Sequence, residues 1–566
     1  MGARLRAGLT SLLTVVGLTA AGTPATASGP EVDVIVRASS PQAQARAQAV
    51  VRRSGGTVQR ELPLISGFAG RVPADAVAAL RRTQGVAEVT EDGSVRMKAD
   101  KWRDDGGVNT SVDKVKNAAG GKKANTTALT GAGIGVALID SGVAPVTGLN
   151  QAGKVVNGPD LSFESQTPGL TNIDTYGHGT HMAGIIAGND AGFQGIAPGA
   201  KLISLKVAAA DGAADVSQVI AAIDWVVTHR NDAGLNIRVL NLSFGTDSAQ
   251  SALLDPLSYA VEAAWKNGIV VVVAVGNDGT AATRVTMPAA NPYVIGVGAA
   301  DPNGTDIRTD DTVATFSSRG SVTRHADLLA AGRSVVSLRV PGSYIDTAYP
   351  GARVTDSAGT VRFFRGSGTS QATAVVSGSV ALLLQQRPGL TPDQVKKLLM
   401  ASADPLATVD PIATGSGQLD ISEAATLPVP LNAVQMFAPS TGLGKLEASR
   451  GSSHVVDATT GVTLTGERDI FGTPWTPMVW APLSGYGQAW TGGTWNGRVW
   501  SGAGYTGTSW ASVTWNTATW TSLNWAGRAW TGSDWTGRAW TATGWTGRAW
   551  TTGTWLGRAW TGRAWT

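Results

Sequence analysis

The sequence predicts an α/β protein in which a parallel sheet is flanked by helices. A small α+β unit precedes this sheet, and a Trp-rich repeat region of unknown fold follows it. Three observations predict this architecture. Apolar runs such as 269–275 are continuous rather than alternating, which is typical of parallel strands buried on both faces. Strand and helix patterns alternate along residues 31–95. Tryptophan recurs at a fixed interval toward the C-terminal end.

Length and composition narrow the classes of function. At 566 residues the chain has room for more than one domain. The formal net charge of +4 is small for this length and the basic residues are scattered, so the composition does not indicate nucleic-acid binding. The chain has no cysteine, which excludes disulfides and cysteine-ligated metals.

Residues 1–27 are predicted to form a signal peptide. Arg4 and Arg6 give a basic start, residues 9–20 form a short apolar core, and Ala25-Thr26-Ala27 has the form of a cleavage site. An uncleaved anchor is the alternative, but this core is too short to span a bilayer. The chain is therefore predicted to be secreted to the extracellular space, with no transmembrane segment.

The small α+β unit is predicted over residues 28–105. Alternating valines indicate its first strand, and Pro41 begins a helix that ends at Gly55-Gly56. Further strands and a second helix follow, at 57–65, 67–72, 73–82 and 86–95. The order βαββαβ is that of small ferredoxin-like domains. The polar stretch 98–109 then indicates a linker.

The first candidate functional residue of the main domain is Asp140. It ends an apolar strand within residues 131–142. A carboxylate at the carboxyl end of a buried strand lies where open α/β sheets place their sites. The alternative is an aspartate that caps a helix or a turn.

The second candidate is His178, in the segment Tyr176-Gly177-His178-Gly179-Thr180-His181. Small residues surround it and an apolar helical stretch follows, so its side chain could act as a general base. His178 and His181 could also be a metal pair, but no glutamate follows the first histidine as in the zinc-protease helix motif. A plain structural histidine is the third alternative.

The third and fourth candidates are Ser370 and Asn277. Ser370 follows a glycine-rich turn and precedes the apolar helical run 374–384. Such a turn can hold a hydroxyl out toward a cleft, where a base must activate it; the alternative is a helix N-cap. Asn277 follows a buried strand and Gly276, so its amide could donate a hydrogen bond to a developing oxyanion.

Together, Asp140, His178 and Ser370 occur in the chain order Asp, His, Ser. The flanking motifs resemble those of the subtilases, the subtilisin-like serine proteases, over roughly residues 31–425. This resemblance implies a subtilisin-like sheet and a catalytic triad. Ser370 would be the nucleophile, His178 the general base and acid, and Asp140 the residue that orients the histidine. Asn277 and the Ser370 backbone N–H would form the oxyanion hole.

The resemblance also places the substrate. The segment Leu242-Ser243-Phe244-Gly245 resembles the subtilase strand that pairs with an extended peptide. Residues Ala274 and Gly276 would form the opposite wall of the primary side-chain pocket. The alternative for residues 242–245 is an ordinary strand of the sheet.

Two features depart from the family pattern. Gln371 stands where the family usually has methionine, and Ala374 stands where it has proline. The loop 188–194, where many subtilases bind calcium, offers only a few side-chain oxygens, whereas calcium takes six to eight oxygen ligands. No metal site and no cofactor are predicted; calcium is possible, but no site for it is assignable.

The resemblance gives the small unit a role as an inhibitory and folding-assisting pro-domain. It would block the active site until it is removed, so the precursor is a zymogen. We predict that the protein cuts itself between Val95 and Asn109. The peptidase domain is then predicted over residues 106–425.

The C-terminal part is predicted to be a linker over 426–474 and a repeat region over 475–566. All of the twenty tryptophans except Trp102, Trp225 and Trp265 lie in the repeat region, mostly at every fifth position. A period of five suits neither one face of a straight helix nor one face of a flat strand. Three alternatives stay open: rings packed as a core, exposed rings that bind polysaccharide, cell wall or protein partners, and disorder.

The sequence thus predicts a secreted serine endopeptidase that is made as a self-processed precursor and acts on proteins or peptides. A surface or cell-wall binding protein, in which the tail is the functional part, is the alternative. An esterase is less favoured, because the serine segment is Gly-Thr-Ser-Gln-Ala rather than Gly-x-Ser-x-Gly.

Overall fold

The computed structural model describes residues 31–62, 67–91, 108–123, 126, 128–165, 167, 169–406, 410–457, 462–491, 494–499 and 520–522. The chain divides into two compact units, residues 1–95 and 96–566, which are described separately. The predicted signal peptide and most of the predicted maturation segment lie outside the described residues. Among the residues that the structure describes, every helix is too short or too polar to cross a membrane.

The first unit is a four-stranded antiparallel sheet with two α-helices. Its elements are β1 (Glu31–Ala38), α1 (Pro41–Arg53), β2 (Thr57–Leu62), β3 (Gly67–Pro73), α2 (Val77–Arg81) and β4 (Val86–Glu91), and the strand order is β2-β3-β1-β4. Ser40 caps α1 through its side chain, and Pro41 fits the first turn because a first-turn N–H has no partner to lose. Val34, Val36, Phe68 and Leu80 are fully buried between sheet and helices.

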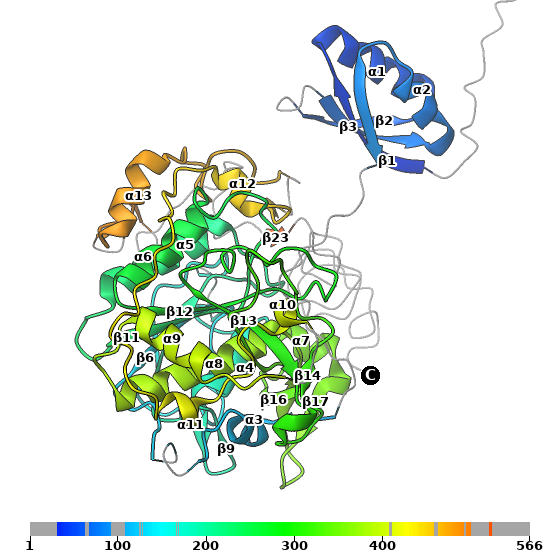
Figure 1. The fold of residues 1–566 in the computed structure, drawn as a ribbon. Coiled ribbons are helices and arrows are strands. Elements are labelled where there is room, and N and C mark those ends of the chain that lie inside the picture. Colours follow the sequence, from blue (N-terminus) through cyan, green and yellow to red (C-terminus); the bar gives the residue numbers. More distant parts are fainter. Residues whose placement is uncertain are drawn as a thin grey trace, which may run out of the picture. The chain divides into compact units, whose positions relative to one another are not determined.

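The second unit is built on an eight-stranded sheet (Figure 1). Its strands are β6 (Gly135–Asp140), β7 (Val155–Asn157), β10 (Lys201–Lys206), β11 (Ile237–Leu242), β12 (Val270–Ala274), β13 (Ile295–Asp301), β14 (Thr312–Val313) and β15 (Leu328–Ala331). The order is β14-β13-β12-β11-β6-β10-β7, and β15 also pairs with β13. All pairs are parallel except β13–β14. The parallel sheet predicted from the continuous apolar runs is therefore present.

Helices cover both faces of this sheet (Figure 1). Helices α4 (His178–Ala187), α8 (Thr369–Gln386) and α9 (Pro392–Ala401) lie on one face, and α5 (Val216–His229) and α6 (Pro256–Lys266) lie on the other. The residues of α8 from Thr369 through Leu384 are all buried, because the helix carries no charged side chain and packs against five strands. The chain crosses from one side of β6 to the other when it passes from β10 to β11, and sites of open sheets lie at such a point.

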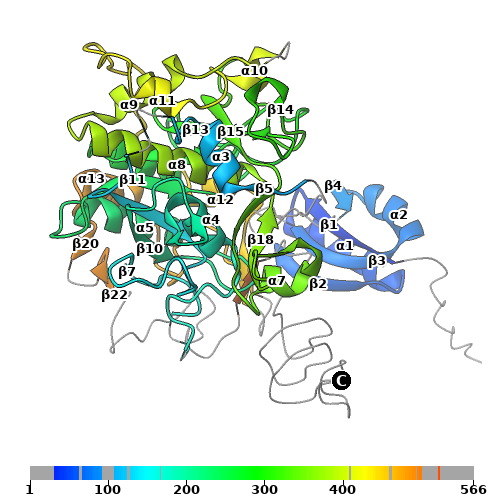
Figure 2. The ribbon, with the colours of Figure 1, turned by 90° about the horizontal axis from the view of Figure 1, so that it is seen from below.

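A smaller sheet and short elements complete this part of the second unit. The sheet has the order β17-β18-β16-β5, from β17 (Arg353–Thr355), β18 (Val361–Gly366), β16 (Val335–Leu338) and β5 (Thr110–Ser111), and Figure 2 shows β5 and β18 on one side of the unit. The short elements are α3 (Val112–Ala118), β8 (Asn189–Asp190), β9 (Phe193–Gln194), α7 (Tyr344–Ala348), α10 (Pro411–Thr414) and α11 (Ile421–Ala424). Strand β18 leads directly into the turn before Ser370.

The segment after residue 426 differs from the linker predicted there. It contains α12 (Leu446–Arg450), β19 (Val455–Asp457), α13 (Pro477–Gly485), β20 (Trp490–Thr491), β21 (Thr494–Trp495), β22 (Arg498–Val499) and β23 (Trp520–Ser522). Leu446, Leu464 and Ile470 are fully buried in the main core. These side chains occur without helical or strand periodicity, so the sequence pattern alone did not indicate that the segment packs against the domain.

The first repeat tryptophans are also buried. Trp475, Trp480, Trp490 and Trp495 belong to the main core, and the ring centroids of Trp475 and Trp480 are 4.8 Å apart. Trp490 pairs with Trp495 across a hairpin in β20–β22. For these four rings the core alternative is correct. The remaining repeat lies outside the described residues, apart from the backbone of residues 498–499 and 520–522.

A buried carboxylate anchors these rings to α5. Asp224 accepts hydrogen bonds from the indole N–H of Trp480 at 3.1 Å and of Trp495 at 2.8 Å, and from the Ser484 hydroxyl. The carboxylate is completely buried, and burial raises its pKa from 3.8 to about 6, although the three donors oppose the shift. The C-terminal segment is therefore held to the domain by hydrogen bonds as well as by apolar packing.

This raised pKa predicts a specific pH dependence of stability. Between pH 4 and 6 the folded state binds more protons at Asp224 than the unfolded state does, so the free energy of unfolding falls as pH rises. Two pKa units correspond to at most about 3 kcal/mol. We expect Asp224→Asn, in a background that lacks the predicted nucleophile (Ser370→Ala), to make this slope smaller. Part of the slope should stay, because burial also raises the pKa of Asp311 to about 6. Urea unfolding at pH 4.5 and 7.5 measures it, and an unchanged slope would contradict the assignment.

Candidate active site

The carboxyl end of β6 places Asp140 beside the start of α4. Asp140 is 5% exposed, and both of its oxygens lie close to His178 Nδ1, at 2.8 Å for Oδ1 and 2.9 Å for Oδ2. A carboxylate on Nδ1 fixes the ring orientation and places the proton on Nδ1, which leaves Nε2 as the basic nitrogen. The structure therefore joins the first two residues that the sequence singled out.

Helix α4 begins at His178 because the preceding residue is a glycine. Gly177 has φ of +103°, and a Cβ there would lie 2.5 Å from the Ser343 hydroxyl oxygen. A residue with a side chain would be strained in this conformation and would also clash. The glycine thus holds the histidine ring at the helix start, against Asp140.

A second aspartate, Asp174, supports this arrangement and was missed in the sequence. It is fully buried and accepts hydrogen bonds from the N–H of Gly177 at 2.6 Å, the N–H of Thr180 at 2.7 Å and the Ser141 hydroxyl at 2.8 Å. Burial raises the pKa of Asp174, and these hydrogen bonds oppose the shift. Asp174 therefore ties the start of α4 to the residue after Asp140. Its position four residues before His178 is the only sequence signal for it.

Ser370 is the second residue of α8 and is 3% exposed. Its hydroxyl donates a hydrogen bond to the Ser243 carbonyl at 2.8 Å, and the Ser243 hydroxyl donates to the Ser370 carbonyl at 3.2 Å. These bonds join the proposed nucleophile to the segment that follows β11. Phe244 and Gly245 of this segment line one pocket together with Asp140, so these residues share one end of the sheet.

Asn277 lies where its amide can donate into the site. Its Oδ1 accepts hydrogen bonds from the Thr369 N–H at 2.9 Å and the Thr369 hydroxyl at 3.1 Å, and these two donors fix the orientation of the amide. A Cβ built on Gly368 would lie 3.5 Å from Asn277 Nδ2 and 3.6 Å from the Ser370 backbone nitrogen. Both predicted oxyanion donors therefore border the same small space.

Gln371 borders this space as well. Its Oε1 would lie 2.9 Å from a Cβ on Gly368, the side chain is 2% exposed, and Oε1 has no hydrogen-bond partner among the described residues. Ala374 is fully buried inside α8 and continues the helix. Neither departure from the family pattern interrupts the turn or the helix.

The predicted substrate-binding residues fall into two groups. Leu242 lies within the sheet and is paired on both sides, with Ile139 and Val273, so it has no free edge for a substrate. The segment Ser243 to Gly245 leaves the sheet, and its Phe244 and Gly245 line the pocket. Ala274 ends β12, and Gly276 has φ of +108°, where a Cβ would lie only 2.7 Å from Thr286 Cγ2. Direct substrate contact thus remains a prediction for Ser243, Phe244, Gly245, Ala274 and Gly276, but not for Leu242.

The acidic residues that could be considered for a metal ion outside this site lie beside arginine side chains. Among the described residues, Asp404, Asp420 and Glu423 are the one group close enough to share a metal ion, and Arg308 lies 2.8 Å from Asp404 and 3.0 Å from Asp420. In the loop 188–194, Asp190 pairs with Arg362 at 2.6 Å. His181 does not face a shared ligand with His178: its Nε2 lies 3.0 Å from the Phe364 carbonyl, and burial lowers its pKa to about 3.

The chain is similar in sequence to proteins of one known family. The profile of the Subtilase family matches residues 131–433, more than half of the chain, and a profile described as a putative peptidase inhibitor domain matches residues 22–92. Serine protease AprX of Bacillus subtilis is 37% identical over 55% of this chain and 71% of its own length. Subtilisin E of the same species is 30% identical over 68% of this chain and 87% of its own length. The solved structure of fervidolysin from Fervidobacterium pennivorans aligns with 71% of this chain and 62% of its own, at 24% identity and a TM-score of 0.45. On the profile match and the identities to AprX and subtilisin E, the chain belongs to the subtilase family.

Proposed function

We propose that the protein is a secreted serine endopeptidase that hydrolyses peptide bonds through Asp140, His178 and Ser370. The observation that carries the proposal is the contact of His178 Nδ1 with both oxygens of Asp140, at 2.8 and 2.9 Å, in a chain of the subtilase family. The substrates would be polypeptides that bind in extended form along Ser243 to Gly245.

The proposed reaction begins when His178 Nε2 takes the proton of the Ser370 hydroxyl. Ser370 Oγ then bonds to the carbonyl carbon of the substrate, and the carbonyl electron pair moves onto its oxygen. Asn277 Nδ2 and the Ser370 N–H donate hydrogen bonds to that oxyanion. When the C–N bond breaks, protonated His178 gives its proton to the leaving amine, and the acyl group stays on Ser370 as an ester.

Water completes the cycle by the same groups. His178 Nε2 takes a proton from the water, whose oxygen bonds to the ester carbon. Collapse of this second intermediate breaks the bond to Ser370 Oγ, releases the carboxylic acid and returns the proton to Ser370. Asp140 stays ionised throughout and stabilises the imidazolium.

Substrate binding would also release the nucleophile. In the structure Ser370 Oγ donates to the Ser243 carbonyl at 2.8 Å. This carbonyl lies on the segment expected to pair with substrate, so an incoming backbone N–H would compete for it. The hydroxyl would then turn toward His178.

The N-terminal unit would act as an inhibitory pro-domain that the protease removes from itself between Val95 and Asn109. The match of residues 22–92 to a putative peptidase inhibitor profile supports this role, together with the linker composition that follows. The basic and apolar pattern of residues 1–27 supports export to the extracellular space.

The experiment is incubation of the purified precursor with unfolded casein, beside a Ser370→Ala control, with fragments identified by mass spectrometry. We expect the wild type to cleave casein and to lose its N-terminal unit, and the Ser370→Ala protein to do neither. A Ser370→Ala protein that still matures in isolation would contradict self-processing. A folded and matured wild type that cleaves nothing would contradict the protease assignment.

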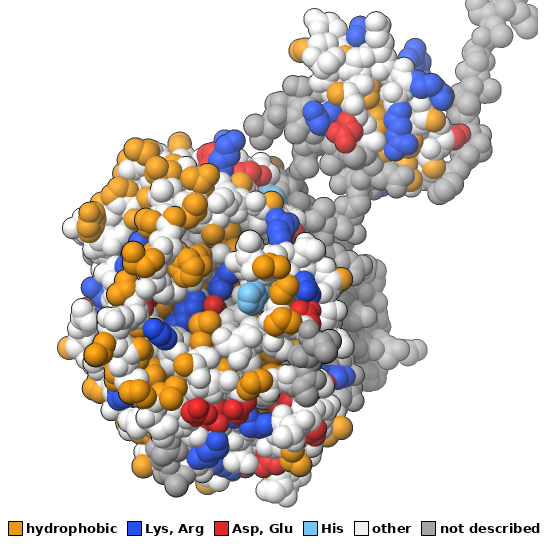
Figure 3. Space-filling view, viewed as in Figure 1, with side chains coloured by type: hydrophobic (Ala, Val, Ile, Leu, Met, Phe, Trp, Pro, Cys, Tyr) orange, Lys and Arg blue, Asp and Glu red, His pale blue; other side chains and the backbone are white. Residues whose placement is uncertain are grey.

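A second function, attachment to a surface such as the cell wall through the C-terminal region, has one observation in its favour. Leu443, Met478, Val479 and Tyr486 are 46%, 70%, 58% and 78% exposed, and Figure 3 shows apolar side chains gathered over the part of the unit where α13 lies. An exposed apolar patch favours a binding surface. Attachment alone would be the function if the protein bound cell wall but left casein intact.

A further inference from the structure

A segment beyond the matched subtilase region forms part of the site. We define the C-terminal brace as the described residues 444–457, 462–491 and 494–499, which follow the end of the family match at residue 433. Ser453 of the brace lines the apolar pocket that also contains Asp140, Phe244 and Gly245. We propose that the brace shapes this pocket and so sets which substrate side chains the enzyme accepts. The inference rests on the proposed protease function.

The pocket lies between two stretches of chain. One stretch is 207–219, which contributes Val207, Ala208, Gly212, Ala214, Asp215, Val216 and Val219. The other is the predicted substrate-pairing segment, which contributes Phe244, Gly245 and Thr246. Most of these side chains are apolar or small, so the pocket suits an apolar side chain of an extended substrate. It is distinct from the primary pocket expected at Ala274 and Gly276.

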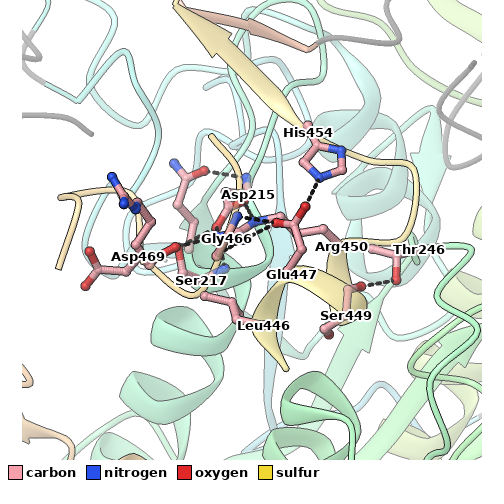
Figure 4. Close-up of polar contacts among 12 residues, drawn as sticks. Asp215, Ser217, Thr246, Leu446, Glu447, Ser449, Arg450, His454, Gly466 and Asp469 are labelled. Atoms are coloured by element: carbon pink, nitrogen blue, oxygen red, sulfur yellow. Dashed lines mark hydrogen bonds and ion pairs between the residues drawn. The ribbon is translucent and has the colours of Figure 1, made fainter. Parts of the chain in front are cut away.

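The brace holds the first stretch through a buried ion pair. Arg450 Nε lies 2.7 Å from Asp215 Oδ1, and both side chains are completely buried (Figure 4). Burial alone would raise the pKa of Asp215, but the Arg450 guanidinium and the Ser217 donors hold it below its ordinary value. Asp215 is also the N-cap of α5, where its Oδ2 accepts from the Ser217 N–H at 2.9 Å. Arg450 thus fixes the position of Asp215, where the stretch 207–219 passes into helix α5.

Arg450 is itself fixed by the brace. Its Nη1 donates to Glu447 Oε2 at 3.0 Å and to the Gly466 carbonyl at 2.8 Å (Figure 4). Its Nη2 donates to the Arg468 carbonyl at 2.6 Å. Glu447 in turn lies 3.1 Å from His454 Nε2. A guanidinium with partners on all three nitrogens is held in one orientation. A shift of the brace would therefore move Arg450, and with it Asp215.

The same short helix also holds the second stretch. The Thr246 hydroxyl donates to the Ser449 carbonyl at 2.7 Å (Figure 4). Asp247 accepts from the Ser452 N–H at 2.7 Å and from the Ser452 hydroxyl at 2.8 Å. Residues 449–452 therefore bridge both walls, and Ser453, the next residue, stands at the pocket itself. Arg450 is a positioning residue, because it acts on the substrate only through Asp215 and the pocket wall.

The test compares matured wild type with Arg450→Met and Ser453→Phe. The substrates are peptides that share one residue at the cleavage position and vary between alanine, leucine and phenylalanine at the more distant positions before it. Active-site titration with a fluorophosphonate normalises each rate to the amount of correctly folded enzyme. Arg308→Met is the matched control, because it removes a partly buried ion pair with Asp420 away from the pocket.

We expect the wild type to prefer a large apolar residue at one distant position. Arg450→Met should lower the ratio of kcat/KM for leucine or phenylalanine over alanine by about tenfold, since pocket contacts of one or two methylenes have effects of this order. Ser453→Phe should lower the same ratio by filling the pocket. Because this variant keeps the ion pair between Arg450 and Asp215, it still tests the inference if Arg450→Met does not fold. Arg308→Met should leave the ratio unchanged.

Two results would overturn the inference while the protease function stands. One is that Arg450→Met lowers kcat/KM equally for all peptides, which would mean that Arg450 supports the fold but not the specificity. The other is an unchanged ratio in Ser453→Phe. A wild type that cleaves none of the peptides or casein would instead refute the proposed function, and the inference with it.

Discussion

Replacing Ser370 by alanine is expected to lower kcat for a peptide substrate by about a millionfold, the size of the effect known for a subtilisin. His178→Ala should cost about as much, and the double variant should lose no more than either single variant. The physical reason is that proton transfer and nucleophilic attack are one event, so removal of either partner abolishes both. The measurement is single-turnover kinetics on a fluorogenic peptide. The N-terminal unit of each purified variant is first removed by a site-specific protease at a recognition sequence inserted into the predicted linker 98–109, because these variants are not expected to remove it themselves.

The Asp140→Asn variant measures how much the orientation of the His178 ring contributes, because it leaves the nucleophile Ser370 and the base His178 in place. The Asp140 carboxylate lies 2.8 and 2.9 Å from His178 Nδ1 and holds the proton on that nitrogen. An asparagine amide can donate to Nδ1 instead, which would place the proton on Nε2 and leave no base for Ser370. We expect kcat of Asp140→Asn to fall by about ten-thousandfold, measured with the same peptide.

The double variant of Ser370 and His178 tests whether these two residues act as a unit. If the losses in Ser370→Ala and His178→Ala add up in the double variant, they do not.

Gly368→Ala is expected to lower kcat by on the order of a thousandfold with little change in KM. The added methyl would occupy the space that lies 3.5 Å from Asn277 Nδ2 and 3.6 Å from the Ser370 nitrogen. Losing one oxyanion donor costs about a hundred- to a thousandfold, and the methyl would keep the oxyanion from both. An effect on kcat alone is expected, because the oxyanion forms only in the transition state.

Gly389→Ala is the matched control for this variant. A Cβ on Gly389 would have no heavy atom within 4 Å, so the same substitution should leave kcat and the unfolding temperature unchanged. Adding Asn277→Ala to Gly368→Ala should cost little more, because the donor is already blocked. A Gly368→Ala enzyme with the kcat of the wild type would mean that this space is not the oxyanion hole.

Much of the fold was predictable because its signals are local. Continuous apolar runs predicted the buried strands β6 and β12, and Pro41 and the glycines after residue 54 predicted the limits of α1. The position of Asp140 as the last residue of a buried strand was predictable from the apolar run before it, and the structure has it there. The segment around Ser370 combined a glycine-rich turn with an apolar helix, and both are present in the structure.

The contacts that were not predictable join residues far apart in the chain. Arg450 and Asp215 are 235 residues apart, and Trp480 and Asp224 are 256 residues apart. Nothing in the local pattern around Arg450 distinguishes it from an exposed arginine, so residues 426–474 resembled a linker. Leu242 was assigned to substrate pairing from its motif, but the motif does not reveal that both of its neighbours in the sheet are already occupied.

The central claim is that Asp140, His178 and the folded site activate one serine. The most direct measurement is to treat the matured protein with a fluorophosphonate and to locate the adduct by mass spectrometry. We predict a single phosphonyl group on Ser370. We expect none in His178→Ala after its N-terminal unit has been removed by a site-specific protease at an inserted sequence, and none when the protein is unfolded in urea before treatment. Labelling of another serine, or equal labelling of Ser370 in the His178→Ala variant, would contradict the account.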